Sequence, residues 1–262
     1  MSQFPQANVH PEAIIGANVI IEPFATVQKD VVIGDSSWIG PGAIIWDGAR
    51  IGKNVKVFPA ASVSSPPQDL KFAGETTETH IGDNTVIRES VTISRGTADK
   101  FKTVIGSNCL LMAYVHVAHD CIIGNNCILA NAVQVAGHVT IDDWAIIAGA
   151  SALHQFVKVG AHVMLSGGSL VRKDVPPFTK AAREPLTYAG INAVGLRRRG
   201  FSSEKINEIQ EIYRHIFLKG LNNSKALDMV VAEVPSSQER DYIVEFIRTS
   251  DRGIIKGYGG SD

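Results

Sequence analysis

The sequence is poor in the features that mark secreted, membrane-spanning and nucleic-acid-binding proteins. It contains 3 cysteines in 262 residues, too few for a disulfide framework. Its 25 lysines and arginines are balanced by 26 aspartates and glutamates, so no broad basic field is available to attract nucleic acid. There is no run of about 18 apolar residues, and the opening MSQFPQANVH lacks the pattern of a signal peptide. We therefore expect a soluble, cytoplasmic protein with no integral membrane segment and no nucleic-acid partner.

What the chain does have is a period of six. From Val9 to Val171 every sixth residue is aliphatic, except Asp69, Glu75 and Asp99. A helix would scatter such positions around its circumference, whereas a hexapeptide β-helix places them inside a triangular prism with three hexads to a coil. The residue two before each aliphatic position also points inward in such a prism, and over residues 109–169 it is always small or β-branched. The period predicts a mainly β protein, a parallel β-helix of hexapeptide repeats.

Two interruptions and one change of period divide the chain. The exceptions to the period fall at about residues 64–80 and 94–103, which we predict to be loops that protrude from the coil. Beyond Val171 the spacing becomes helical, with an apolar stripe that begins at Ile206 after the capping residue Ser202. Further helical patterns follow at about 224–234 and 238–250. We predict a β-helix domain over residues 1–185 and an α-helical C-terminal domain over residues 186–262.

Candidate catalytic residues lie at outward positions, because the inward ones are occupied by packing. Stacked coils should align His119, Gly137 and Gln155 in one column, and Asp120 and His138 in the next. A histidine that titrates near neutral pH, a carboxylate that fixes its tautomer and a glycine N–H above it suit the deprotonation of a hydroxyl and the binding of an oxyanion. Any one of these histidines alone would equally suit a solvated corner. Their grouping favours catalysis.

These residues, with others outside the repeat, resemble the UDP-N-acetylglucosamine O-acyltransferase family, which opens lipid A biosynthesis. The resemblance covers nearly the whole chain. The hexads alone would be weak evidence, because unrelated acyltransferases share them. The motifs that carry the resemblance are Ala118-His119-Asp120-Cys121, Ala136-Gly137-His138-Val139, His154-Gln155-Phe156, Gln68-Asp69-Leu70-Lys71, Ile87-Arg88-Glu89-Ser90-Val91-Thr92-Ile93 followed by Arg95-Gly96, and Gly195-Leu196-Arg197-Arg198-Arg199-Gly200-Phe201.

The resemblance implies a left-handed β-helix that assembles as a homotrimer with active sites between subunits. It implies transfer of a 3-hydroxyacyl chain from acyl carrier protein to the 3-hydroxyl of UDP-N-acetylglucosamine, with no cofactor and no metal. The implied catalytic residues are the base His119, its partner Asp120, and Gly137 as the oxyanion donor. The implied substrate-binding residues are Asp69, Lys71, His116, His138, His154, Gln155, Asn192, Arg198 and Arg199.

One departure from the family pattern concerns the nucleotide site. A glutamate is expected two residues after Asn192, but this chain has Val194, which leaves a polar contact to the nucleoside open. The run from Arg197 to Arg199 suits a docking site for phosphates or for an acidic carrier protein, and would equally suit a solvated helix end.

A second glycine column concerns the acyl chain. Gly149 and Gly167 should stack, one coil above Asn131, on a different edge from His119. In a trimer that edge would face a neighbouring subunit. The position that matches Gly167 limits the acyl tail in the family, so a glycine there implies a chain of about fourteen carbons or more. Both glycines would also suit corners chosen for backbone conformation alone.

Three other functions are compatible with parts of the pattern. Hexad β-helices include zinc-dependent carbonic anhydrases, and His116, His119 and His138 could converge on a metal between subunits. A non-catalytic scaffold has no need for an aligned histidine column. The related enzyme that N-acylates glucosamine typically carries an added N-terminal domain, whereas the hexads here begin at Val9.

Overall fold

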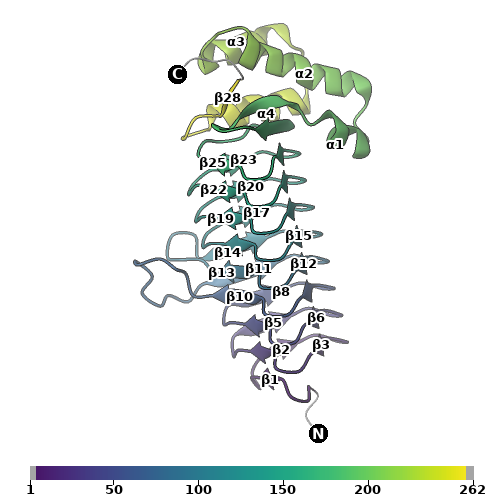
Figure 1. Cartoon of the computed structure of the whole chain (residues 1–262), viewed down its shortest axis with the longest axis vertical. Helices are drawn as coiled ribbons and strands as arrows, with labels where there is room; N and C mark the ends of the chain where they lie inside the picture. The colour runs from purple at the N-terminus through teal and green to yellow at the C-terminus, as the bar shows by residue number, and fades with distance from the viewer. Residues whose placement is uncertain (1–3, 258–262) are drawn as a thin grey trace.

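The computed structural model describes residues 4–257 and is a long three-sided prism with helices at its C-terminal end (Figure 1). The chain winds upward from the N-terminus, and each turn adds one short strand to each of three parallel sheets. We name these sheet A, sheet B and sheet C, and name each corner of the prism by the two sheets it joins. Strands of one sheet pair eighteen residues apart where no loop intervenes, as in the pair His116 and Gln134.

Sheet A has nine strands and sheet B has eight. The strands of sheet A are β1 (Asn8–Val9), β4 (Thr26–Val27), β7 (Ile44–Ile45), β10 (Ser62–Ser65), β13 (Thr92–Ser94), β16 (His116–Val117), β19 (Gln134–Val135), β22 (Ala152–Leu153) and β25 (Leu170–Val171). The strands of sheet B are β2 (Ile14–Ile15), β5 (Val31–Ile33), β8 (Ala49–Ile51), β11 (Glu78–Ile81), β14 (Lys102–Ile105), β17 (Ile122–Ile123), β20 (Thr140–Ile141) and β23 (Lys158–Val159).

Sheet C has eleven strands and carries the chain into the helical region. Its strands are β3 (Ile20–Ile21), β6 (Trp38–Ile39), β9 (Lys56–Val57), β12 (Val86–Ile87), β15 (Leu110–Leu111), β18 (Ile128–Leu129), β21 (Ile146–Ile147), β24 (Met164–Leu165), β26 (Thr179–Ala182), β27 (Thr187–Ile191) and β28 (Lys256–Gly257).

The interior of the prism contains the aliphatic residues of the six-residue period. Leu111, Val117 and Leu129 are fully buried, and so are the small residues two positions before them, such as Val115 and Cys127. Because the parallel strands place identical positions in register, each inward side chain packs on its counterparts in the coils above and below. The interior therefore forms one continuous hydrophobic core along the prism.

The corners require glycine and asparagine for two different reasons. Asn18 and Asn126 adopt left-handed backbone conformations, with φ of 57° and 58°. The glycines that follow the aliphatic positions do not adopt such conformations, but they lie against the next coil. A Cβ on Gly34 would lie 2.6 Å from the carbonyl carbon of Gly52, so only glycine fits there.

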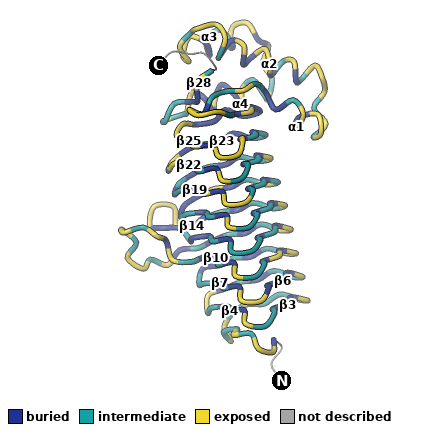
Figure 2. Tube along the Cα trace, in the orientation of Figure 1, coloured by how far each residue is buried: buried dark blue, intermediate teal, exposed yellow. Residues whose placement is uncertain are grey.

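Two loops leave the prism at corner AB and protrude from its side (Figure 1). The first covers residues 66–77 and the second residues 95–101. Both are shorter than the predicted intervals, because β10, β11, β13 and β14 extend into them. The added pairs join Glu78 to Lys102 and Thr79 to Thr103. Much of the first loop is exposed to solvent (Figure 2).

The C-terminal region combines strands with four helices, namely α1 (Ala193–Arg198), α2 (Ser203–Leu218), α3 (Asn223–Glu233) and α4 (Gln238–Arg248). Ser202, Asn222 and Ser237 cap the last three helices by accepting backbone N–H bonds. A second hydrophobic cluster, which includes Ile209 and Tyr213, lies under these helices. The antiparallel pair β26 and β27 was not predicted, and it encloses the predicted boundary at residue 185, so the division into two domains stays a prediction.

Within residues 4–257, every helix is too short or too polar to cross a membrane.

Candidate active site

His119 and Asp120 lie at corner AB, between β16 and β17. The N–H of His138 donates to the carbonyl of His119 at 3.1 Å, and the N–H of Phe156 donates to the carbonyl of Gly137 at 3.2 Å. These bonds place His119 and Gly137 in successive coils of the same corner, so the two columns expected from the repeat do form.

Asp120 is held as a buried carboxylate by the second loop and by His119. It has no exposed surface, and it accepts hydrogen bonds from Thr97 N at 3.0 Å, Thr97 Oγ1 at 2.6 Å and His119 Nδ1 at 2.8 Å. Burial by itself raises the pKa of Asp120, but the bonds from Thr97 and His119 outweigh burial and keep that pKa below its usual value. An ionised Asp120 requires the proton of a neutral His119 to sit on Nδ1.

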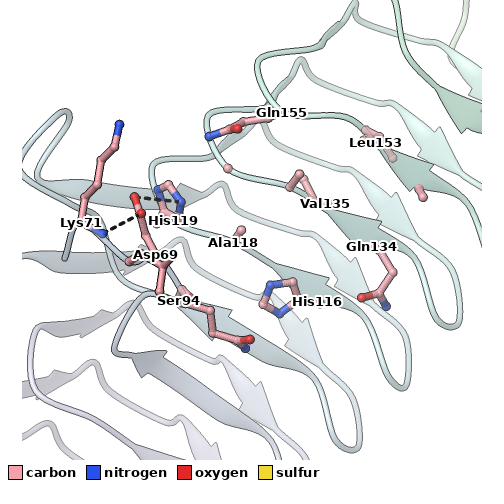
Figure 3. A pocket seen from close by; sticks show the side chains of 15 residues that line it. Asp69, Lys71, Ser94, His116, Ala118, His119, Gln134, Val135, Leu153 and Gln155 are labelled. Atoms are coloured by element: carbon pink, nitrogen blue, oxygen red, sulfur yellow. Dashed lines mark hydrogen bonds and ion pairs between the residues drawn. The ribbon is translucent and has the colours of Figure 1, made fainter.

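The other ring nitrogen of His119 is therefore free to accept a proton. Nε2 faces an open cavity of about 810 Å³, and its nearest carboxylate oxygen is Oδ2 of Asp69, 3.9 Å away (Figure 3). The Asp69 side chain reaches toward His119 from the first loop, where its Oδ1 also accepts the backbone N–H of Lys71 at 3.0 Å. The Lys71 side chain extends away from His119 in the same view.

Gly137 lies directly against the ring of His119. A Cβ at this position would lie 2.7 Å from Cε1 and 2.8 Å from Nε2 of His119, so any side chain would displace the imidazole. In the described part of the chain, the N–H of Gly137 donates to no acceptor. The site thus combines a free imidazole nitrogen with a free backbone donor, the pair needed for proton abstraction and oxyanion binding.

Two of the predicted histidines and one glutamine lie around this centre. His116 and Gln155 line the same cavity as His119. His116 Nδ1 lies 2.7 Å from Thr92 Oγ1, and burial followed by the charge of His119 lowers its pKa. His138 stacks on Phe156 at a centroid distance of 4.6 Å and lines a smaller cavity of about 370 Å³, and Asp69 lines both cavities.

The remaining predicted residues lie elsewhere. His154 is exposed and does not line the cavity; its Nδ1 lies 3.1 Å from the carbonyl of Gln155. Gly149 and Gly167 stack at corner CA, where the N–H of Gly168 donates to the carbonyl of Gly149. Asn192 caps helix α1 at corner BC and is buried there, while Arg198 is exposed.

Arg199 also belongs to corner BC, where it contacts His162 and Trp144. The residues implied by the family resemblance are therefore distributed over all three corners. One protomer alone does not bring the base, the glycine column and the arginines together.

The alternative zinc site between subunits stays a hypothesis, and one protomer brings together only part of it. Within residues 4–257, the group with metal-binding spacing is His119, Asp120 and His138, whose candidate ligand atoms lie within 4.8 Å of one another. It does not include His116. The Asp120 oxygens in it already accept hydrogen bonds from Thr97 and His119.

Thr97 and Thr103 hold Asp120 in place, and sequence reasoning missed both. Thr97 donates two bonds to Asp120, and Thr103 Oγ1 accepts the N–H of Asp120 at 2.9 Å. Both lie in or next to the second loop, where the six-residue period is interrupted. The period therefore does not predict that they lie near Asp120. The motif Arg95-Gly96 was the available signal, since a Cβ on Gly96 would lie 2.2 Å from the N of Lys102 and the tight loop requires glycine.

Comparisons with known proteins agree on one family. A family model described as "Udp N-acetylglucosamine O-acyltransferase; Domain 2" matches residues 174–255, and one described as "Bacterial transferase hexapeptide (six repeats)" matches residues 30–57 and 102–137. An acyl-[acyl-carrier-protein]–UDP-N-acetylglucosamine O-acyltransferase from Chlorobaculum parvum is 53% identical over 260 residues, covering 94% of this chain and 96% of that protein. Another from Trichlorobacter lovleyi is 46% identical, covering 98% and 100%.

Solved structures give the same result. A UDP-N-acetylglucosamine acyltransferase from Bacteroides fragilis has a TM-score of 0.94 at 53% identity, over 96% of this chain and 99% of that chain. One from Francisella novicida has a TM-score of 0.94 at 39% identity, over 97% and 94%. The predicted fold class, a left-handed parallel β-helix with a C-terminal helical region, is confirmed, and the protein is an acyltransferase. The chain belongs to the UDP-N-acetylglucosamine O-acyltransferase family.

Proposed function

We propose that this protein transfers a 3-hydroxyacyl chain from acyl carrier protein to the 3-hydroxyl of UDP-N-acetylglucosamine in the cytoplasm, the first step of lipid A biosynthesis. The names of its relatives support the two substrates. The observation that supports the chemistry best is the free Nε2 of His119, which faces an open cavity while Nδ1 is bound to the buried Asp120.

The proposed reaction needs only groups that the chain supplies. His119 Nε2 accepts the proton of the sugar hydroxyl, and the oxygen attacks the thioester carbonyl carbon. The resulting oxyanion accepts a hydrogen bond from the N–H of Gly137. When the intermediate collapses, the C–S bond breaks, and His119 returns the proton to the departing thiolate. Asp120 remains a carboxylate throughout and stabilises the imidazolium.

Substrate binding is assigned around this centre. Asp69, Lys71, His116 and Gln155 are proposed to contact the sugar and the pantetheine arm, because all four line the cavity. His138 contacts the same substrates from the smaller cavity beside it. His154 is proposed to reach them from the rim of the cavity, since it is exposed and its neighbours Leu153 and Gln155 line the cavity.

We propose a homotrimer that completes each site. The outward face of sheet C carries an apolar row along the prism, and monomeric proteins rarely leave such surface uncovered. The row consists of Val86, Leu110, Ile128, Ile146 and Met164. Packing of a neighbour there would bring corner CA, with Gly149 and Gly167, and corner BC, with Asn192, Arg198 and Arg199, toward the catalytic corner of another protomer.

The function is tested by incubating the purified protein with 3-hydroxyacyl carrier protein and UDP-N-acetylglucosamine and identifying the product by mass spectrometry. We expect an ester on the sugar and stoichiometric release of free carrier thiol. Absence of the ester would contradict the proposed function. Stoichiometric bound zinc together with hydration of carbon dioxide would support the carbonic anhydrase alternative instead.

A further inference from the structure

Corner BC changes its character over the last coils of the prism. Its left-handed positions hold asparagine or serine in the lower coils, up to Asn126, and then Trp144, His162 and Phe178, with φ of 63°, 61° and 63°. The three rings stack, at centroid distances of 6.3 Å and 5.5 Å and interplanar angles of 4° and 14°. In the lower coils the side chains at these positions share only a left-handed backbone conformation. In the last coils the side chains also form a column of stacked aromatic rings.

Arg199 lies on this column. Its guanidinium carbon is 5.3 Å from the centroid of Trp144, and its Nη1 lies 3.2 Å from Nδ1 of His162. A guanidinium has only donors, so Nη1 donates, Nδ1 accepts, and a neutral His162 carries its proton on Nε2. Burial, followed by the charge of Arg199, lowers the pKa of His162 to about 4, which keeps the ring neutral at physiological pH.

Neither His162 nor Trp144 carries a negative charge, so these contacts do not neutralise Arg199. No carboxylate within residues 4–257 forms an ion pair with Arg199, although its side chain is partly buried. His162 and Trp144 occupy one donor and one face of the guanidinium, and the remaining N–H groups are available. A fixed and uncompensated guanidinium is suited to bidentate binding of a phosphate.

We infer that His162 and Trp144 are positioning residues that hold Arg199 for a phosphate group of the substrates. The inference rests on the proposed function, which supplies two phosphate-bearing substrates: the nucleotide sugar, with its diphosphate, and the carrier protein, with its phosphopantetheine. The two residues act through Arg199 and do not touch the reacting atoms.

The chain itself supplies matched variants. His162→Asn retains an acceptor at the δ position and a residue type already found at this corner, as in Asn126. His162→Ala removes the acceptor, and alanine tolerates the backbone conformation elsewhere in the chain, as in Ala150 with φ of 57°. Trp144→Asn removes the ring below the guanidinium in the same way.

The test measures kcat and the KM of each substrate for wild type, His162→Asn, His162→Ala, Trp144→Asn, Arg199→Ala and the double variant His162→Ala/Arg199→Ala. We expect His162→Ala and Trp144→Asn to raise one KM about tenfold with kcat within about twofold, and His162→Asn to stay within about threefold of wild type. A raised KM for UDP-N-acetylglucosamine assigns the phosphate to the nucleotide, and a raised KM for the carrier assigns it to phosphopantetheine.

The double variant separates positioning from simple packing. It should match Arg199→Ala, because His162 has nothing left to position. Unchanged KM values in His162→Ala, or an undiminished effect of His162→Ala when Arg199 is absent, would overturn the inference while leaving the proposed function intact. A wild-type protein that forms no ester would instead contradict the proposed function. In that case calorimetric titration with UDP and with phosphopantetheine still tests the inference, since we expect one of the two ligands to bind more weakly to His162→Ala than to wild type. Equal binding of both ligands to the two proteins would overturn it.

Discussion

The interior of the prism and its catalytic corner are built from the same repeat, but they use it differently. In the interior every position has the same requirement, an aliphatic or small side chain that stacks on its neighbours, and buried residues such as Leu129 and Val135 are interchangeable in kind. At corner AB the repeat only sets positions, and the buried Asp120 is held by Thr97, which belongs to no repeat. The repeat thus accounts for the core and for the columns at the corner, and the loop that interrupts it supplies the bonds to Asp120.

The largest expected effect comes from a substitution at the catalytic corner that lowers turnover far more than it lowers stability. His119→Ala removes the proposed base from a corner outside the hydrophobic core, so we expect turnover to fall at least ~100-fold with the fold retained. Stability should fall by about 1–3 kcal/mol, because the buried Asp120 loses one hydrogen bond. Steady-state kinetics and circular dichroism on the same preparation measure both. Near-normal turnover in the folded variant would remove His119 from the mechanism.

A substitution at corner CA should alter the preference for acyl-chain length without affecting the interior of the prism or corner AB. Gly167→Met fills the glycine column above Gly149, so a groove there would close to the end of a long acyl chain. Each excluded methylene is worth ~0.8 kcal/mol, and loss of several should shift preference toward a donor of about ten carbons by ~100-fold. Competition between donors of two lengths measures the ratio, and an unchanged ratio would place the acyl tail elsewhere.

A core substitution should show the reverse of the His119→Ala result. Leu129 is fully buried in the interior, so Leu129→Ala should lower the free energy of unfolding by about 2–5 kcal/mol through lost burial and a cavity. The turnover of the folded fraction should stay within about twofold of wild type. Urea unfolding and kinetics measure the two, and a selective loss of kcat without loss of stability would contradict the separation.

The loop contact should give a smaller effect, confined to the chemical step. Thr97→Val removes the 2.6 Å bond to Asp120 while leaving the backbone bond, and we expect kcat to fall about tenfold with the KM values little changed. Thr97→Ser keeps the hydroxyl and should restore most of kcat. If valine and serine behave alike, the hydroxyl does not position Asp120.

The smallest expected effect is on how stability changes as the pH is lowered. The pKa of His162 is lowered to about 4 in the folded protein, so the unfolded chain binds more protons between that value and about pH 6.5. Stability is present above pH 6.5 and is lost as the pH falls through this window. His162→Asn lacks this contribution to stability, so its melting temperature should fall less than that of wild type between pH 7 and pH 4. Parallel curves for the two proteins would contradict the lowered pKa.

The sequence predicted the coils because each inward position repeats one physical requirement. It also predicted the columns of His119 and Asp120, since register follows from the repeat once coils stack. It could not predict the contact of Thr97 with Asp120, because a loop that leaves the coil obeys no period. Nor could it predict β27, whose pairing with β26 extends sheet C only after the hexads have ended.

The arginine run shows the same limit. Its composition suggested an anion site, but the contact of Arg199 with His162 joins residues from a helix and a corner that no pattern relates. The role of His154 stays a prediction. Its spacing resembles that of the site histidines, and its exposed side chain lies next to the cavity-lining residues Leu153 and Gln155.

The protonation of His119 is the feature on which the catalytic corner depends most. Nitrogen NMR of protein labelled with 15N-histidine, with His119 assigned by its absence from the spectrum of His119→Ala, reports which ring nitrogen carries the proton near pH 7. We expect a proton on Nδ1, bound to Asp120, and a bare Nε2 facing the cavity. A neutral His119 protonated at Nε2 could not accept the proton of a substrate hydroxyl, and that result would contradict its assignment as the base.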